Sequence, residues 1–137
     1  VYAKECGHAG IMEFNGDVYS CDHFVFPEYR LGNIREKTIT EMLYGEQQQQ
    51  FSRLKSQSLP KECKECEWEF ACHGECPRTR FIKDVYGNPG KNYLCEGYRM
   101  FFRHIAPYMD FMKKEYMNQR PPSNVMQHIQ EIEDSRK

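Results

Sequence analysis

The sequence predicts a small, cysteine-rich α+β domain with a β-hairpin, short helices, an irregular metal-binding loop and a kinked C-terminal helix. Three observations support this fold class. Residues 10–24 carry strand-forming side chains on both sides of an Asn-Gly pair. Residues 58–92 hold four cysteines and three prolines with little periodic pattern. Residues 93–119 carry one apolar stripe at helical spacing.

The first predicted element is a hairpin whose turn is Asn15-Gly16-Asp17. Asn and Gly both tolerate the positive φ angles that two-residue hairpin turns require. The hairpin ends at Cys21, so we expect it to bring Cys6 and Cys21 towards each other. Residues 25–37 contain proline, glycine and asparagine, and are predicted to be a loop.

A helix should begin at Thr38, because Thr38 followed by Glu41 has the spacing of a capping box. Gly45 suits the end of this helix. A second helix is expected around Phe51. The glutamine run at residues 47–50 is predicted to be a solvated face of that second helix rather than a low-complexity tract.

The C-terminal segment 93–119 is the clearest helical pattern. Its apolar stripe is predicted to pack in a core and consists of Leu94, Tyr98, Phe101, Ile105, Tyr108, Met112 and Tyr116. Pro107 should kink this helix or split it in two. The prolines at 121–122 should end it. We therefore predict a domain at residues 1–119 and a polar tail, or frayed helix, at residues 120–137.

Length and charge exclude several classes of function. The chain has 137 residues and a formal net charge of -1, with basic and acidic residues interspersed. This pattern predicts no nucleic-acid partner, because such a partner needs a clustered basic surface. No segment has the apolar length of a membrane span or the pattern of a signal peptide, which predicts a cytoplasmic protein without a membrane partner. The first residue is Val1, so we expect a fragment or a processed product.

Seven cysteines dominate the chemistry of the chain. An odd count disfavours a disulfide scaffold, and C-x2-C spacing without an export signal favours metal. The cysteines form C-x9-G-x4-C, then C-x2-C-x5-C-x3-C, and one more after eighteen residues: Cys6, Cys21, Cys63, Cys66, Cys72, Cys76 and Cys95. Four thiolates can hold either a [4Fe–4S] cluster or a tetrahedral zinc ion, and spacing alone does not separate the two.

This cysteine pattern resembles the SPASM domain, the auxiliary-cluster module that follows the barrel of some radical S-adenosylmethionine enzymes. All seven cysteines match its consensus. The segments 21–25 (CDHFV) and 30–34 (RLGNI) resemble the anaerobic sulfatase-maturating enzymes more specifically. Those enzymes oxidise a cysteine or a serine of a sulfatase to formylglycine. The resemblance covers about residues 6–110.

The resemblance implies two auxiliary [4Fe–4S] clusters that accept or relay the electron released by the oxidation. One cluster would be held by Cys63, Cys66, Cys72 and Cys95. The other would be held by Cys6, Cys21 and Cys76, with a fourth cysteine upstream of Val1. S-adenosylmethionine and a third cluster would bind to an upstream barrel of the same polypeptide, and a sulfatase peptide would be the substrate. Without that barrel, the fragment is expected to be inactive.

Two alternatives stay open at this point. The chain could be a zinc-binding structural or interaction module, or the SPASM domain of another peptide-modifying radical enzyme. Thiolate sites take zinc readily, so zinc is also expected in a fragment prepared in air.

Asp22 is implied as the catalytic base, because its position after Cys21 matches the residue proposed for that role in the family. His8, His23 and His73 lie near cysteines and could ligate zinc, with His73 the first candidate, although each is more often an ordinary polar residue. His104 and His128 are expected to be structural or solvated. Aromatic side chains near the cysteines, namely Tyr29, Trp68 and Phe70, are expected to shield the clusters from water.

Overall fold

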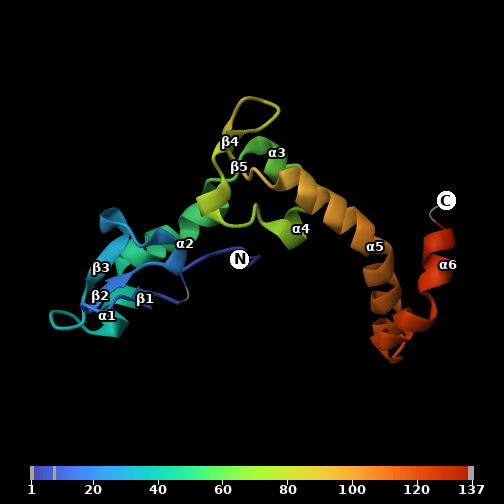
Figure 1. The fold of residues 1–137 in the computed structure, drawn as a ribbon, viewed down its shortest axis with the longest axis horizontal. Helices are drawn as coiled ribbons and strands as arrows, with labels where there is room; N and C mark the ends of the chain where they lie inside the picture. Colours follow the sequence, from blue (N-terminus) through green and yellow to red (C-terminus); the bar gives the residue numbers. More distant parts are fainter. Residues whose placement is uncertain (1, 8, 136–137) are drawn as a thin grey trace. The chain divides into compact units, whose positions relative to one another are not determined.

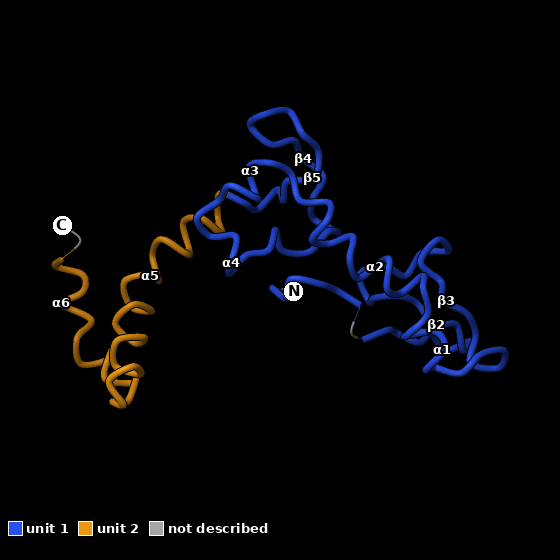
Figure 2. Tube along the Cα trace, turned by 180° about the vertical axis from the view of Figure 1, so that it is seen from behind, with its two compact units in different colours: residues 1–95 blue, residues 96–137 orange. Residues whose placement is uncertain are grey.

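The computed structural model describes residues 2–7 and 9–135 and divides the chain into two compact units. These units are Val1–Cys95 and Glu96–Lys137, coloured separately in Figure 2. The division falls at the start of the long helix, whereas the domain boundary predicted after residue 119 lies at the end of that helix. His8, one of the predicted zinc ligands, lies outside the described residues.

The first unit mixes short strands and short helices, which confirms the predicted α+β class (Figure 1). In chain order its strands and α-helices are β1 (Ile11–Met12), β2 (Asp17–Tyr19), β3 (Arg30–Asn33), α1 (Ile39–Tyr44), α2 (Glu46–Gln57), α3 (Lys61–Lys64), α4 (Glu69–Cys72), β4 (Ile82–Lys83) and β5 (Pro89–Lys91). Three 3-10 helices lie between them, at Asp22–Phe24, Pro27–Tyr29 and Pro77–Thr79.

The predicted hairpin is present as the antiparallel pair β1 and β2, with Ile11 opposite Tyr19. Gly16 takes a φ of 89°, and the backbone N–H of Asp17 donates to Asn15 Oδ1 at 3.0 Å. A turn therefore forms at the predicted place, but of the Asn-Gly pair only Gly16 has a positive φ. Glu13 N–H donates to Asp17 O and Gly16 N–H donates to Glu13 O, both at 2.9 Å, so the loop has three residues rather than two.

Residues 25–37 were predicted to be a loop, and this prediction is wrong for the segment that forms β3. This strand pairs antiparallel with β2, with Val18 opposite Gly32. Its composition is unfavourable for a strand, so side-chain contacts hold it in place. Leu31 packs in a small core with Val18 and Met42, which joins the sheet to α1.

The N-terminus of α1 has the predicted capping box. The backbone N–H of Glu41 donates to Thr38 Oγ1 at 3.2 Å, and the backbone N–H of Thr38 donates to Glu41 Oε2 at 2.8 Å. Both groups would otherwise lack a partner at the start of the helix. The box fixes where α1 begins, and α1 then places Met42 in the core against the sheet.

The glutamine run was predicted to be solvated, and this is wrong for Gln48. Gln48 is 1% exposed, whereas the three other glutamines of the run are exposed. The buried residues of α2 are Gln48, Phe51 and Lys55, which share one helix face at spacings of three and four. A polar residue thus occupies a core position of this helix because its amide has acceptors there.

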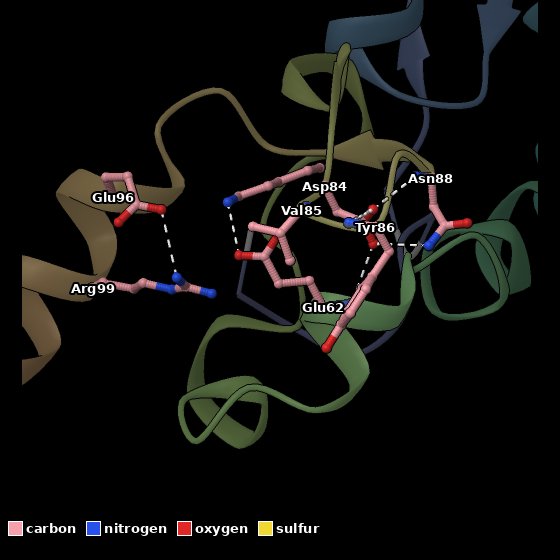
Figure 3. A network of polar contacts seen from close by, with 8 residues as sticks. Glu62, Asp84, Val85, Tyr86, Asn88, Glu96 and Arg99 are labelled. Carbon is pink, nitrogen blue, oxygen red and sulfur yellow. Dashed lines mark hydrogen bonds and ion pairs between the residues drawn. The ribbon is translucent and has the colours of Figure 1, made fainter.

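Residues 58–92 contain more regular structure than their sequence predicts. In addition to α3 and α4, they form the antiparallel pair β4 and β5, with Ile82 opposite Lys91. Two carboxylates anchor this hairpin to α3, as Figure 3 shows. Asp84 accepts from the backbone N–H of Glu62 at 3.3 Å, and Glu62 accepts from Val85 N at 3.0 Å and Lys91 Nζ at 2.8 Å.

The second unit is built on α5, which spans Cys95–Met117, close to the predicted range. The helix continues through Pro107 and is not split, and its axis changes direction along its length in Figure 1. The predicted core packing of its stripe is wrong in part, since Phe101 is 53% and Tyr116 is 71% exposed. None of the described helices is long and apolar enough to cross a membrane.

The predicted polar tail forms a 3-10 helix at Pro122–Gln127 and a short helix, α6, at Ile129–Asp134. Glu115, the buried residue of α5, connects this segment to the long helix. Its carboxylate accepts from Arg120 Nη2 at 2.6 Å and from Asn124 Nδ2 at 2.7 Å. The two donors hold the pKa of Glu115 down at about 2.

Candidate metal centre

The first candidate set is Cys6, Cys21 and Cys76, which come from three separate parts of the first unit. Cys21 follows β2, and Cys76 lies between α4 and the next 3-10 helix. All three pack against one apolar cluster that contains Phe24 and Phe51, and Cys76 is 5% exposed. The structure therefore brings together the three cysteines that the resemblance assigns to one cluster.

Three aromatic rings form the apolar wall beside this set. Phe24 lies 4.8 Å from Tyr29 and 5.2 Å from Phe51 between ring centroids, and Tyr29 lies 5.7 Å from Phe51. The sequence pointed to Tyr29 but not to the two phenylalanines. Phe70, also predicted to shield the site, is 70% exposed, which does not fit that role. Trp68 is half-buried.

Gln48 is a site residue that sequence reasoning missed. Its Nε2 donates to the carbonyl oxygen of Gly7 at 2.8 Å and to that of Ser20 at 3.1 Å. These two carbonyls are next in sequence to Cys6 and Cys21, so one amide ties both cysteine segments to α2. The sequence does contain a signal for the burial of Gln48, because it lies three residues before Phe51 and so on the same helix face.

The second candidate set is Cys63, Cys66, Cys72 and Cys95, each of them half-buried. Burial, followed by the charge of Cys95 and then contributions from Cys72 and Cys66, raises the pKa of the Cys63 thiol to about 11. The charges of the three other cysteines of the set thus all act on the Cys63 thiol. Cys63 lies on α3, whose position the Glu62 and Asp84 contacts fix (Figure 3).

All seven cysteines are free thiols. Burial raises the pKa of Cys6, Cys21 and Cys72 above the ordinary value for a thiol. For Cys6 the nearby ammonium of Lys55 acts in the opposite direction. Such thiols keep their protons in neutral solution without metal and release them when a metal binds, because the thiolate is the ligand. The donor set therefore fits thiolate-bound metal.

Asp22 and His23 lie at the exposed edge of the first set. The Cys21 thiol donates to Asp22 Oδ1 at 3.1 Å, and this hydrogen bond is the main cause of a lowered Asp22 pKa. His23 Nδ1 is 3.2 Å from Cys76 Sγ. One donor atom from each of Cys21, Asp22 and His23 lies within 4.8 Å of the others.

The remaining histidines lie in other surroundings. His73, the histidine that the sequence favoured as a zinc ligand, has its Nδ1 3.3 Å from Glu69 Oε1. The structure instead places His23 against a predicted ligand. His128 contacts Glu131 at 2.8 Å and the ring of Phe111, in keeping with a structural role. The His104 ring is 5.7 Å from that of Tyr108.

Comparison with known proteins agrees with this geometry. Residues 6–67 match the SPASM model, described as an iron-sulfur cluster-binding domain. The chain is 62% identical over 129 residues to a serine-type anaerobic sulfatase-maturating enzyme of Bacteroides thetaiotaomicron, covering 94% of this chain and 31% of that protein. It is 34% identical over 111 residues to the cysteine-type enzyme of Clostridium perfringens, covering 77% of this chain and 30% of that protein.

The fold also has a solved counterpart. The structure of native anSMEcpe with bound AdoMet and Kp18Cys peptide superimposes with a TM-score of 0.65 at 34% identity, covering 77% of this chain and 29% of that one. The chain therefore carries an iron–sulfur cluster-binding domain of the SPASM class. Within that class it belongs with the SPASM domains of the anaerobic sulfatase-maturating enzymes. It spans about 31% of the length of the first of these relatives.

Proposed function

We propose that this chain is the auxiliary-cluster part of a radical S-adenosylmethionine enzyme that oxidises a sulfatase side chain to formylglycine. Cys63, Cys66, Cys72 and Cys95 would hold one [4Fe–4S] cluster. Cys6, Cys21 and Cys76 would hold a second, with a fourth ligand from outside this chain. The observation that carries the proposal is the packing of three free cysteines from separate segments, Cys6, Cys21 and Cys76, against one apolar cluster. Reduced thiols of this kind suit the cytoplasm.

The bound clusters would supply a one-electron acceptor or relay for the oxidation of the substrate. The residues of this chain would contribute binding, shielding and proton transfer. The aromatic wall of Phe24, Tyr29 and Phe51 would keep water away from the first cluster. Asp22 would accept the substrate proton. Loss of the Cys21 proton on metal binding would remove the hydrogen bond that now occupies Asp22, which frees its carboxylate for that role.

The barrel that binds S-adenosylmethionine would belong to the same polypeptide, since the relatives are much longer than this chain. The substrate would be a sulfatase peptide. Relatives of both the serine type and the cysteine type occur, and the higher identity to a serine-type enzyme favours serine as the oxidised residue.

The test is metal analysis of the complete polypeptide after anaerobic reconstitution. Cys63→Ala and Cys76→Ala are compared with the wild type, because they remove one ligand from each proposed set. Each variant should lose roughly four irons and four sulfides, and the double variant roughly eight, leaving only the iron of the upstream cluster. Stoichiometric zinc in place of iron in the wild type would contradict the proposal. So would loss of all clusters in either single variant while the protein stays folded.

A further inference from the structure

Arg80 is a buried cation that donates hydrogen bonds to a run of backbone carbonyl oxygens. Its side chain is 9% exposed. Nη2 donates to His73 O at 2.8 Å and Glu75 O at 3.0 Å, Nε to Gly74 O at 2.8 Å, and Nη1 to Lys55 O at 2.7 Å. The carbonyls of His73, Gly74 and Glu75 belong to the three residues that separate Cys72 from Cys76. One guanidinium therefore binds this whole turn and connects it to α2.

The turn needs such a partner because its backbone is unusual. His73, Gly74 and Glu75 have φ angles of 46°, 66° and 56°, so three successive residues lie in the left-handed region. Residues other than glycine rarely adopt it, and a run of them is unfavourable without support. A Cβ atom at Gly74 would contact Leu59 and lie 2.8 Å from Arg80 Nη2. The packing of the turn against Arg80 leaves no room for a side chain there.

This turn joins the two candidate metal sites. Cys72 belongs to the second cysteine set and Cys76 to the first. Since Arg80 binds every carbonyl between them, it fixes where one set lies relative to the other.

The charge of Arg80 also reaches both sets. Among the described residues its hydrogen-bond acceptors are neutral, namely the four carbonyls and the Ser58 hydroxyl. Two of the carbonyls belong to His73 and Glu75, which are next in sequence to Cys72 of the second set and Cys76 of the first. The guanidinium therefore lies beside a predicted ligand of each set. A buried charge is unfavourable unless an opposite charge is near. Thiolates and the clusters that they bind would supply that opposite charge.

We propose that Arg80 is a positioning residue that fixes the two cysteine sets relative to each other and supplies a positive charge that both bound clusters share. This inference rests on the proposed function, because it presumes two clusters. Its consequence is that one residue, itself no ligand, sets both the retention of iron and the reduction potential at two sites. A nearby positive charge stabilises the more negative, reduced state of a cluster.

The test uses the complete, anaerobically reconstituted polypeptide and two readouts that do not depend on turnover. These are the rate of iron release to a chelator and the midpoint potentials of the auxiliary clusters followed by electron paramagnetic resonance. Arg80→Gln removes the charge and the fork of donors, whereas Arg80→Lys keeps the charge. Arg78→Gln is the matched control, since Arg78 is an exposed arginine two residues away.

We expect Arg80→Gln to release iron from both sites at least tenfold faster than the wild type. The midpoint potentials of the auxiliary clusters in Arg80→Gln should also fall. At a fixed solution potential the ratio of reduced to oxidised cluster should drop tenfold, and a tenfold change corresponds to a shift of 59 mV for a one-electron couple. Arg80→Lys should release iron faster but keep its potentials. Arg78→Gln should match the wild type in both readouts.

The two proposals fail in different ways. A wild type without auxiliary clusters would overturn the proposed function and this inference with it. The other outcome is a wild type that holds both clusters while Arg80→Gln matches Arg78→Gln in iron release and in midpoint potentials. That result would overturn the role of Arg80 alone. Should Arg80→Gln not fold, iron release from Arg80→Lys at the wild-type rate would overturn that role in the same way.

Discussion

Single side chains determine the chemistry at the exposed edge of the first cysteine set. Asp22 is exposed, and its pKa is lowered chiefly by the Cys21 thiol. Its carboxylate is therefore ionised in neutral solution, and loss of the Cys21 proton on metal binding would free it to accept a proton. Its neighbour in sequence is a predicted ligand, so a proton acceptor and an electron acceptor would lie within reach of the same substrate.

Replacing Asp22 by asparagine tests this role directly. In the complete enzyme, Asp22→Asn should lower formylglycine formation by roughly 100-fold or more, because general bases contribute about that much to a rate. Mass spectrometry of the sulfatase peptide measures the product. Glu28→Gln, which removes another exposed carboxylate from the same region, should be active. Full turnover of Asp22→Asn with its iron intact would exclude the role.

At the scale of secondary-structure elements, the capping box of α1 determines the packing next to the first site. Thr38 and Glu41 satisfy each other's backbone groups, and α1 then presents Met42 to the small sheet core. Helix α2 follows after Gly45 and carries Gln48, which holds the segments of Cys6 and Cys21. A short local motif thus contributes to the arrangement of two predicted ligands.

The contribution of the cap can be measured with Thr38→Ala. This change should lower the free energy of unfolding by about 1 kcal/mol, the usual effect of losing an N-cap. Thr40→Ala is the control, because Thr40 is exposed within the same helix and has no capping role. Denaturant unfolding of the metal-free polypeptide gives both values. Equal stability of the two variants would show that tertiary contacts, rather than the cap, fix the start of α1.

The elements that could be predicted from the sequence are those stabilised by neighbours in sequence. The Asn-Gly turn, the capping box and the long amphipathic helix all have local signals. Strand β3 and the attachment of the β4–β5 hairpin to α3 lack such signals, because side chains distant in sequence, such as Asp17 and Glu62, hold them. The cysteine positions were readable from spacing. Gln48 and Arg80 were not, since their roles depend on carbonyl oxygens that the fold brings to them.

At the scale of the whole molecule, each compact unit contains a carboxylate held in its ionised form. Asp17 accepts from Arg30 Nε at 2.8 Å and Asn33 Nδ2 at 3.0 Å in the first unit, which keeps its pKa at about 2. Glu115 is held in the same way by Arg120 and Asn124 in the second unit, with a pKa of about 2. Both values lie below those of unfolded chains, about 3.9 for Asp and about 4.3 for Glu.

Acid should therefore destabilise both units in the same pH window. A carboxylate whose folded pKa is depressed stabilises the fold above the unfolded pKa, and this contribution disappears as the pH falls from about 4.5 towards 2. Asp17→Asn and Glu115→Gln should each flatten the pH dependence of stability within that window. Thermal unfolding of the metal-free polypeptide between pH 2 and pH 6 measures it. A slope identical to that of the wild type in both variants would contradict the assignment.

The turn from Cys72 to Cys76 has a consequence for how such a domain can change over generations. Three residues separate a predicted ligand of one site from a predicted ligand of the other, and the carbonyls of all three accept from the same arginine. An inserted or deleted residue there would displace both sites at once, whereas the exposed tip of the β4–β5 hairpin offers more freedom. A change in the length of this turn would therefore alter both predicted sites together, whereas the loss of a single cysteine would alter only one.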